Sequence, residues 1–506
     1  MTTLSRPITW EQFKKYLKKM KSYEEAIGLI YWDMRTGAPK KGIENRSEVV
    51  GELSGELFKM SVSDEMGAYI EHFTSPEGSK DLSDTDRRIV RECQREYDRS
   101  RKIPPDKYQA YVVLTSQAEA AWEDAKHSSD WDSFRPYLEK IVQTNLEFVE
   151  LWGYEGHKYN TLLDMYEPGM TVEKLDEVFG ALRAQVVPLL AEIQKSAHQP
   201  DTGFLKQTFE KEKQKRFSLY ILEQMGYDFE AGRLDETVHP FATGLNPGDV
   251  RITTRYLTDD VNSALFGTIH EGGHALYEQN ISEELLGTPL CTGTSMGIHE
   301  SQSRFWENVI GRSRPFWSRY FGEVQKTYPG QFDNVTAEGF YRATNEVKPS
   351  LIRIEADELT YNLHIMIRYE IEKALFSGEA QVEDLPELWN AKYREYLGIE
   401  PSNNGEGVLQ DVHWSGGAFG YFPSYALGNM YAAQFTRALQ KDLGDIDALV
   451  SEGNLLPIKA WLTDKIYKYG KSRTPNELVL EVTGEELNPQ YLVDYLRTKY
   501  SDIYKL

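Results

Sequence analysis

The sequence predicts a mainly α-helical fold with one small β-sheet, and three observations support this prediction. Most of the chain before Thr237 carries apolar side chains at the spacing of amphipathic helices. A period-two alternation, typical of a β-strand, occurs between Thr237 and Leu257. Helical patterns then resume to the C-terminus. With 506 residues, 40% of them apolar, the chain is long enough for a large core.

The helical pattern is clearest from Phe134 to Val149, where apolar side chains recur at intervals of three, four and seven residues. Prolines at Pro104, Pro105 and Pro200 interrupt the pattern. Five further segments are expected to be helical: Trp10 to Ile30, Ser47 to Phe58, Asp84 to Arg99, Asp106 to Ala125 and Val172 to Lys195.

The strand is expected from Val250 to Tyr256, where apolar or small side chains alternate with polar ones. The turn residues Asn246-Pro247-Gly248-Asp249 come directly before it, which indicates a hairpin or small sheet. A Gly-rich stretch, Asn403 to Gly420, breaks the later helical pattern. Because no repeat or linker marks a boundary, we expect residues 1–506 to form a single domain, either one body or two helical lobes around a cleft.

Composition excludes several classes of partner. The formal net charge of −22 argues against nucleic acid, since such proteins bind phosphates through clustered Lys and Arg. Cys93 and Cys291 are too few for a disulfide framework, which indicates a reducing compartment. The N-terminus lacks the apolar core of a signal peptide, and no run of about 18 apolar residues predicts a membrane span. We therefore expect a cytoplasmic protein without a membrane partner.

The main chemical signal is His270-Glu271-Gly272-Gly273-His274. Residues four apart lie on one helical face, so the two imidazoles can bind one zinc ion. Glu271 is rotated about 100° from His270, beside the metal, where it suits a general base rather than a ligand. A chance match in this composition is expected in roughly 2 of 100 such chains. Each glycine costs about 1 kcal/mol in a helix, which suggests close approach of a substrate or backbone.

A catalytic zinc normally takes three protein ligands and a water, so a further ligand is expected elsewhere. The stretch Thr294 to Glu307 is the best source. Spacing leaves His299, Glu300 and Glu307 as candidates, and the two glutamates share a helical face. Each could equally be a solvated helix charge. The expected helix carries an apolar stripe, formed by Ile298, Phe305, Trp306 and Val309.

Taken together, the motifs resemble those of the carboxypeptidase Taq family of zinc metallocarboxypeptidases, distant relatives of the helical oligopeptidases and of angiotensin-converting enzyme. The resemblance spans essentially the whole chain. Each short motif is weak evidence alone, but the ordered set is strong. The six motifs are His239-Pro240-Phe241, Asp249-Val250-Arg251-Ile252-Thr253, His270-Glu271-Gly272-Gly273-His274, His299-Glu300-Ser301-Gln302, Ile352-Arg353-Ile354-Glu355-Ala356-Asp357 and Gly407-Val408-Leu409-Gln410-Asp411-Val412-His413-Trp414.

The resemblance implies that Glu300 completes the zinc site with His270 and His274. It also implies a mainly helical, gluzincin-like fold with a small sheet beside a deep active-site groove. The resemblance further implies a homodimeric enzyme that removes single residues from the free C-terminus of peptides. Zinc is the expected metal, and cobalt can replace it in related enzymes.

In the expected mechanism, zinc lowers the pKa of its water and Glu271 accepts the proton. The oxyanion needs further hydrogen-bond donors, for which His413, Tyr421 and Tyr425 are the candidates. The spacing from His413 to Tyr421 is similar to that of the donors in the converting-enzyme relatives. We assign these two to catalysis and Tyr425 to substrate binding. A tyrosine beside Gly and Pro is, however, often only a packed surface aromatic.

An exopeptidase must also bind the substrate's free carboxylate, and arginine suits this group best. Arg353 is the first choice and Arg251 and Arg255 are the second, although any one arginine could simply form a surface ion pair. His239 is expected to line the groove, or to be a buried structural histidine. Two aspartates could orient a ligand imidazole: Asp357 and Asp411.

Two alternative functions stay open from the sequence. An endo-oligopeptidase or dipeptide-releasing enzyme would use the same zinc chemistry but would not need a free C-terminus. A metal-stabilised helical scaffold or peptide-binding module would keep its function after Glu271→Gln, whereas a peptidase would lose turnover.

Overall fold

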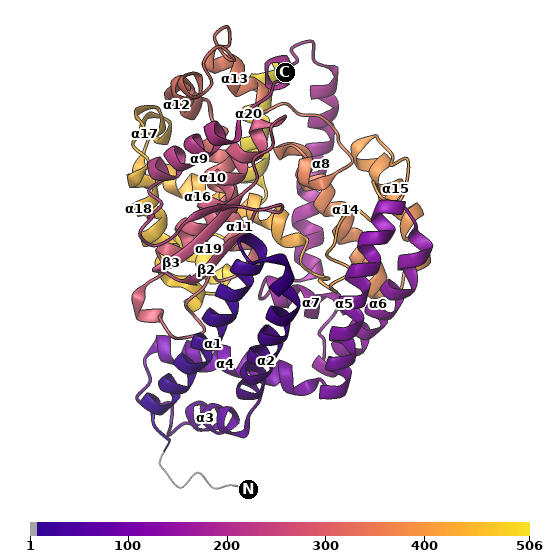
Figure 1. Ribbon diagram of the computed structural model, residues 1–506, viewed down its shortest axis with the longest axis vertical. Coiled ribbons are helices and arrows are strands. Elements are labelled where there is room, and N and C mark those ends of the chain that lie inside the picture. The colour runs from indigo at the N-terminus through magenta and orange to yellow at the C-terminus, as the bar shows by residue number, and fades with distance from the viewer. Residues whose placement is uncertain (1–7) are drawn as a thin grey trace. The chain divides into compact units, whose positions relative to one another are not determined.

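The computed structural model describes residues 8–506 and is mainly helical with a small sheet, which confirms the predicted fold class (Figure 1). The chain separates into two compact units, each assembled from distant segments. Unit 1 contains residues up to 102, 207–294 and 453–474, and unit 2 contains residues 103–206, 295–452 and 475–506. The single-domain assignment stays a prediction. The predicted lack of an export signal rests partly on residues 1–7, which lie outside the described residues.

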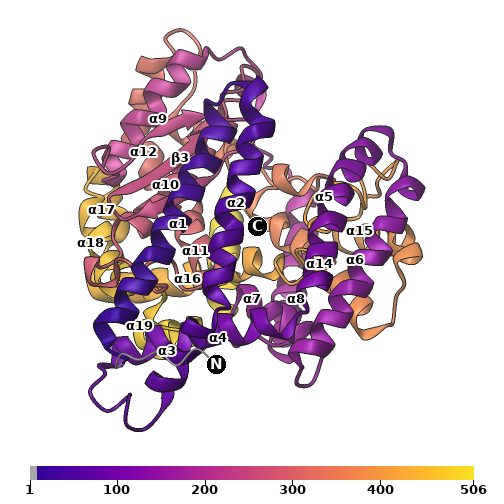
Figure 2. The same ribbon diagram turned by 60° about the horizontal axis from the view of Figure 1, so that its bottom comes forward.

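Unit 1 begins with a long helical hairpin, in which α1 and α2 lie side by side (Figure 2). A capping box at Thr9 starts α1. Helix α1 extends beyond its predicted C-terminal end to Thr36, and α2 extends beyond both of its predicted ends. The helices of this unit are α1 (Trp10–Thr36), α2 (Ile43–Ser61), α3 (Asp64–Thr74), α4 (Asp84–Lys102), α9 (Lys211–Met225), α10 (Val261–Gln279) and α18 (Leu456–Lys465).

The sheet has the strand order β1 (Leu234–Glu236), β3 (Asp249–Thr254) and β2 (Ala242–Asn246). Strands β2 and β3 are antiparallel and joined at the predicted turn, so the predicted hairpin is confirmed. Strand β1 pairs in parallel with β3 and was not predicted, because three residues show no period. Val250 and Ile252 are fully buried, and β3 packs against α10.

Helix α10 is fixed at its start and along its length. The Asp260 side chain caps it by accepting from the backbone N–H groups of its first turn. The Thr268 hydroxyl lies 3.0 Å from the hydroxyl oxygens of Ser218 on α9 and Thr254 on β3. Gly272 allows α9 to approach, since a Cβ atom there would lie 2.7 Å from Leu222. The expected close neighbour of Gly272 is therefore a side chain, not a backbone or a substrate.

Unit 2 contains the remaining helices, and α8 has the predicted bounds because Thr171 caps its start. Helices α5 and α6 pack side by side (Figure 2). The Gly-rich stretch forms a loop between α15 and α16, as expected. The helices are α5 (Pro105–Ser128), α6 (Trp131–Trp152), α7 (Tyr159–Tyr166), α8 (Val172–Lys195), α11 (Met296–Arg304), α12 (Arg314–Thr327), α13 (Ala337–Ala343), α14 (Glu358–Ser377), α15 (Leu385–Leu397), α16 (Pro423–Leu443), α17 (Ile446–Glu452), α19 (Pro475–Thr483) and α20 (Gln490–Tyr504).

The helix expected from 294 to 307 changes its geometry part-way. Helix α11 ends at Arg304, and a π-helical segment follows (Phe305–Gly311). The wider turn shifts the apolar stripe by one position, so that Ile310 is buried and Val309 only half-buried. The predicted stripe is therefore wrong at its last residue.

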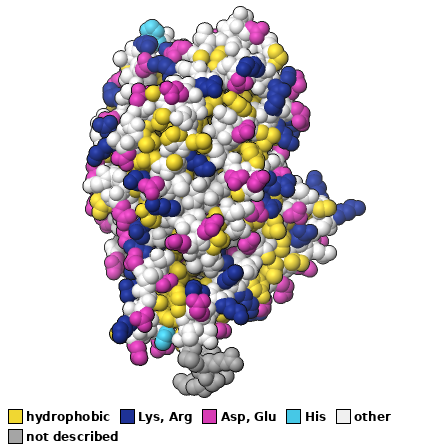
Figure 3. Space-filling view, turned by 90° about the vertical axis from the view of Figure 1, so that its left-hand side faces the viewer, with side chains coloured by type: hydrophobic (Ala, Val, Ile, Leu, Met, Phe, Trp, Pro, Cys, Tyr) yellow, Lys and Arg dark blue, Asp and Glu magenta, His cyan; other side chains and the backbone are white. Residues whose placement is uncertain are grey.

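The surface and the thiols agree with an ordinary globular chain. Acidic and basic side chains are interspersed on the face seen in Figure 3. Cys93 and Cys291 are both free, and burial raises the pKa of the Cys93 thiol to about 12. Among residues 8–506, none of the helices combines the length and apolarity that a membrane crossing requires.

Candidate metal centre

The two histidines of the H-E-x-x-H motif lie on α10 in unit 1. The ring centroids of His270 and His274 are 5.0 Å apart, with an angle of 79° between the ring planes. Both rings are half-buried, whereas the neighbouring Glu271 is only 7% exposed. The arrangement is the one that i, i+4 spacing predicts, with two imidazoles on one helical face.

Glu300 lies on α11 in unit 2 and is 6% exposed. Its Oε1 accepts from Nε of Arg304 at 2.7 Å, and its Oε2 accepts from the Ser303 hydroxyl at 3.1 Å. These contacts orient the carboxylate. Two imidazoles and a carboxylate are donors that suit a zinc ion, so the chemistry of the three side chains fits the expected metal.

The other two candidates for the third ligand differ from Glu300 in their surroundings. Glu307 lies between Arg304 at 3.5 Å and Arg312 at 3.0 Å. Arg304 thus contacts both glutamates, which share a face as predicted. His299 is half-buried on the first turn of α11. A carboxylate held by two arginines is a poorer metal ligand, which favours Glu300 over Glu307.

The loop that carries His413 is held by buried polar contacts within unit 2. Asp411 accepts from Arg353 at 2.9 Å and from Arg368 at 2.6 Å. Gln410 accepts from the backbone N–H of Arg353 at 3.0 Å and from Arg368 at 2.8 Å. From α5, Trp122 donates to the carbonyl of the residue before Gln410 at 2.9 Å. The backbone before His413 is therefore fixed.

His413 lies among aromatic side chains. Its Nε2 is 3.2 Å from the Tyr425 hydroxyl, and its ring centroid is 5.5 Å from that of Tyr421. Burial, together with the positive charges of Arg353 and Arg368, lowers the pKa of His413 to about 4. Burial raises the pKa of Tyr421 to about 12. At neutral pH both side chains are uncharged and can donate hydrogen bonds.

The arginines expected to bind a substrate carboxylate already have partners, with one exception. Arg353 is 5% exposed and is bound to Asp411 and to the Tyr361 hydroxyl. Arg251 makes two contacts of 2.7 Å with Asp249. Arg255 is exposed, and its guanidinium group has no partner among residues 8–506.

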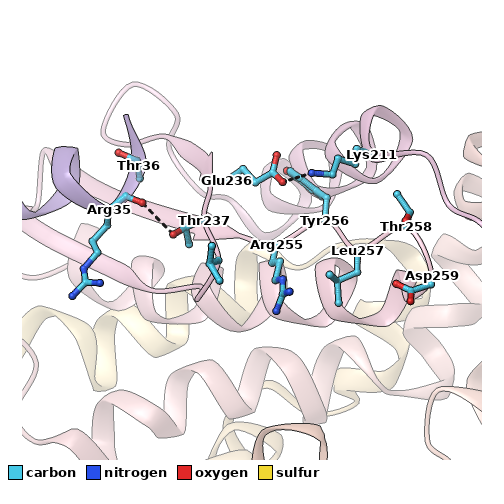
Figure 4. Close-up of a pocket in the computed structure, with 11 residues that line it drawn as sticks. Arg35, Thr36, Lys211, Glu236, Thr237, Arg255, Tyr256, Leu257, Thr258 and Asp259 are labelled. Atoms are coloured by element: carbon cyan, nitrogen blue, oxygen red, sulfur yellow. Dashed lines mark hydrogen bonds and ion pairs between the residues drawn. The ribbon is translucent and has the colours of Figure 1, made fainter. Parts of the chain in front are cut away.

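Arg255 lines an open pocket of about 530 Å³ in unit 1. In Figure 4, Arg255 and Arg35 extend to the same side of this pocket. Lys211, also in the lining, forms an ion pair with Glu236 at 2.6 Å. The pocket therefore offers a carboxylate two guanidinium groups that are unpaired within the described chain.

Three secondary assignments need correction or restriction. His239 is exposed, so the alternative of a buried structural histidine is wrong. Asp357 caps α14 by accepting from the backbone N–H groups of Leu359 and Thr360. Asp411 binds two arginines, as described above. The contacts that the two carboxylates make are therefore to a helix start and to arginines, and their role towards a ligand imidazole stays a prediction.

Comparison with known proteins agrees with this chemistry. A model of the carboxypeptidase Taq (M32) metallopeptidase family matches residues 12–500. The chain belongs to this family. Carboxypeptidase 1 of Bacillus subtilis (strain 168) is 53% identical, over 98% of this chain and 99% of the relative. Thermostable carboxypeptidase 1 of Thermus thermophilus is 44% identical, over 96% of each chain.

Solved structures of Taq-family enzymes have the same fold. The M32 carboxypeptidase from Deinococcus radiodurans R1 has a TM-score of 0.95 at 37% identity, covering 98% of this chain and 99% of the other. The Pyrococcus furiosus carboxypeptidase has a TM-score of 0.94, at the same identity and coverage. This chain is therefore a metallocarboxypeptidase, and its family implies a bound metal ion.

Two buried residues of this Taq-family chain were missed in the sequence. Glu372 accepts from Tyr159 at 2.5 Å, from Trp414 at 2.7 Å and from the backbone N–H of Gly420 at 2.9 Å. It thereby holds the part of the loop that follows His413. Arg368, one turn earlier on α14, binds Asp411. In the sequence, Arg368 and Glu372 are two charged residues four apart within an otherwise apolar helix, which could have indicated a buried role. The same spacing is also typical of an ordinary ion pair between neighbours on one helix.

Proposed function

We propose that this protein is a zinc-dependent carboxypeptidase that removes single residues from the C-terminus of peptides. One observation carries the metal assignment. In the part of the chain that the structure describes, His270, His274 and Glu300 are the group of side chains that could hold a metal ion together. Because the histidines belong to unit 1 and the glutamate to unit 2, the proposal requires that both units contribute to one centre.

Glu271 is the proposed general base. A zinc ion bound at this centre would polarise the scissile carbonyl and lower the pKa of water. The carboxylate of Glu271 accepts the proton of the attacking water and passes it to the leaving amine. Its low exposure supports this role, because little bulk water competes for the carboxylate.

His413 and Tyr421 are the proposed donors to the oxyanion that forms at the substrate carbonyl. Both are half-buried and uncharged at neutral pH, and a hydrogen bond from a partly desolvated donor is stronger than one in water. The fixed backbone around Asp411 supports their role, since a donor that is already oriented costs no reorganisation during the reaction. Tyr425, hydrogen-bonded to His413, is the proposed substrate contact beside them.

Recognition of the free carboxylate is assigned first to Arg353, because the planar guanidinium group suits a carboxylate, with Arg251 and His239 as further substrate contacts. The internal partners of Arg353 and Arg251 argue for Arg255 as the stronger alternative. We also propose a cytoplasmic homodimer that acts on peptides and binds neither nucleic acid nor membranes. The net charge of −22 supports the exclusion of nucleic acid.

Mass spectrometry of two matched peptides tests this function. The peptides share one sequence, and one ends in a free carboxylate and the other in an amide. Zinc-loaded protein should shorten only the free peptide, one residue at a time from its C-terminus. Internal cleavage, or equal hydrolysis of the amidated peptide, would instead indicate an oligopeptidase.

A further inference from the structure

Glu300 packs directly against the backbone of helix α16 at Gly428. A Cβ atom built on Gly428 would lie 2.6 Å from Cγ of Glu300, 2.8 Å from its Cβ and 3.1 Å from its carbonyl carbon. These atoms belong to the stem of the side chain and to the backbone of α11, not to a flexible end. Only glycine at position 428 allows this approach, although glycine is unfavourable inside a helix.

A second close contact lies one turn away at the same helix crossing. A Cβ atom on Gly297 of α11 would lie 2.5 Å from Oε2 of Glu167 and 3.1 Å from the Tyr431 ring of α16. Glu300 lies about one turn after Gly297 on α11. Gly428 lies about one turn before Tyr431 on α16. The two helices therefore run antiparallel, and at each level a glycine faces a large side chain.

Glu167, directly after the last residue of α7, forms hydrogen bonds to both α11 and α16 at this contact. Its Oε2 accepts from the backbone N–H of Gly297 at 2.9 Å, and its Oε1 accepts from the Tyr431 hydroxyl at 2.8 Å. A slip of one residue along α16 would break the bond to Tyr431 and place Leu427 or Asn429 against Glu300. The register of α11 on α16 is therefore fixed by shape and by hydrogen bonds together.

We propose that Gly428 is a positioning residue for the metal centre. By omitting a side chain, it lets α16 support the stem of Glu300, while Arg304 and Ser303 orient the carboxylate. The inference rests on the proposed role of Glu300 as a metal ligand. A ligand displaced by a fraction of an ångström meets the metal in poorer geometry, so the effect of a substitution should appear in metal affinity.

Zinc titration of the apo protein with a competing indicator tests the proposal without measuring activity. Gly428→Ala should weaken zinc binding about 10- to 100-fold, the range expected for residues that support a ligand. The matched control is Gly322→Ala on α12, where a Cβ atom meets nothing within 4 Å. This control should bind zinc like the unsubstituted protein. Unchanged affinity in Gly428→Ala would overturn the proposal.

Glu300→Ala separates this inference from the proposed function. If Glu300→Ala binds zinc normally, the proposed ligand set is wrong. If Glu300→Ala loses zinc and Gly428→Ala does not, only the positioning role is wrong. Should Gly428→Ala fail to fold, the Glu300→Gly/Gly428→Ala double variant should fold again, because it removes the clashing side-chain atoms. A double variant that also fails to fold would contradict the contact.

Discussion

Nη2 of Arg353 lies 2.9 Å from Oδ1 of Asp411, in a buried ion pair two positions before His413. Arg368 binds the second oxygen of the same carboxylate at 2.6 Å. The two positive charges lower the pKa of Asp411 well below its usual range, despite its burial. Arg353 and Arg368 together hold Asp411, and with it the His413 loop, in place. Because two positive charges face one carboxylate, a net positive charge lies near His413.

Arg353→Ala should destabilise the fold, because it leaves a buried carboxylate with one partner. The expected loss of unfolding free energy is about 3–5 kcal/mol, measured by urea unfolding. Arg255→Ala is the matched control, since that side chain is exposed and has no partner in the described chain, and its stability should not change. A stable Arg353→Ala protein with only a raised KM would instead support direct binding of the substrate carboxylate.

His413→Gln should lower kcat by about 10²- to 10³-fold without shifting the acid limb of the pH profile. With a pKa of about 4, His413 is uncharged at neutral pH and does not titrate in the working range. A pH profile of kcat/KM for both proteins measures this. His127→Gln, on the exposed last turn of α5, is the control. Loss of an ionisation near the ordinary histidine pKa of about 6.5 in the His413 variant would contradict the assignment.

Glu372 should make the protein less stable as the pH rises from about 4.5 to about 7. Burial raises the pKa of this carboxyl to about 7, so the folded state binds a proton that the unfolded state has released. The stabilisation, on the order of 3 kcal/mol, is complete at pH values below the unfolded pKa and is lost as the pH passes the folded one. Glu372→Gln should therefore cost more stability at about pH 5 than at about pH 8.

Urea unfolding at both pH values checks this prediction. Glu379→Gln, on the exposed turn after α14, is the control and should leave the pH dependence unchanged. An equal cost of Glu372→Gln at the two pH values would show that the carboxyl group titrates normally in the folded protein.

Glu271→Gln should keep the fold and the metal but lower kcat by about 10²- to 10⁴-fold, the usual contribution of a general base. The amide has nearly the same shape and cannot accept the proton. Elemental analysis and steady-state kinetics of one preparation measure both properties. A variant with full activity would remove Glu271 from the mechanism, and a variant without metal would make it a ligand.

Local patterns made most of the fold predictable. The helix from Val172 to Lys195 has its predicted ends because its cap and its apolar period agree. The strand β3 follows its alternation as far as Ile252, but Thr253 and Thr254 are both buried and the strand ends at Thr254, before the predicted end at Tyr256. The π-helical segment after Arg304 was not predictable, because apolar spacing does not show where a helix widens. Strand β1 was missed because its pairing with β3 is set by contacts distant in the sequence.

The candidate site was predictable only where its residues are close together in the sequence. The i, i+4 spacing of His270 and His274 places both rings on one helical face. Long-range pairing cannot be read in this way. The partner of Arg353 lies 58 residues away, so the sequence did not show that this arginine forms a buried ion pair with Asp411. Gly428 carries no side chain, so only its contact with Glu300 indicates its importance.

The proposed zinc mechanism depends on one metal ion that can be removed and restored. Purified active protein should contain one zinc ion per chain by elemental analysis, lose turnover on dialysis against a chelator, and recover it when zinc is added back. Turnover that survives the chelator, or active protein without stoichiometric metal, would contradict the account.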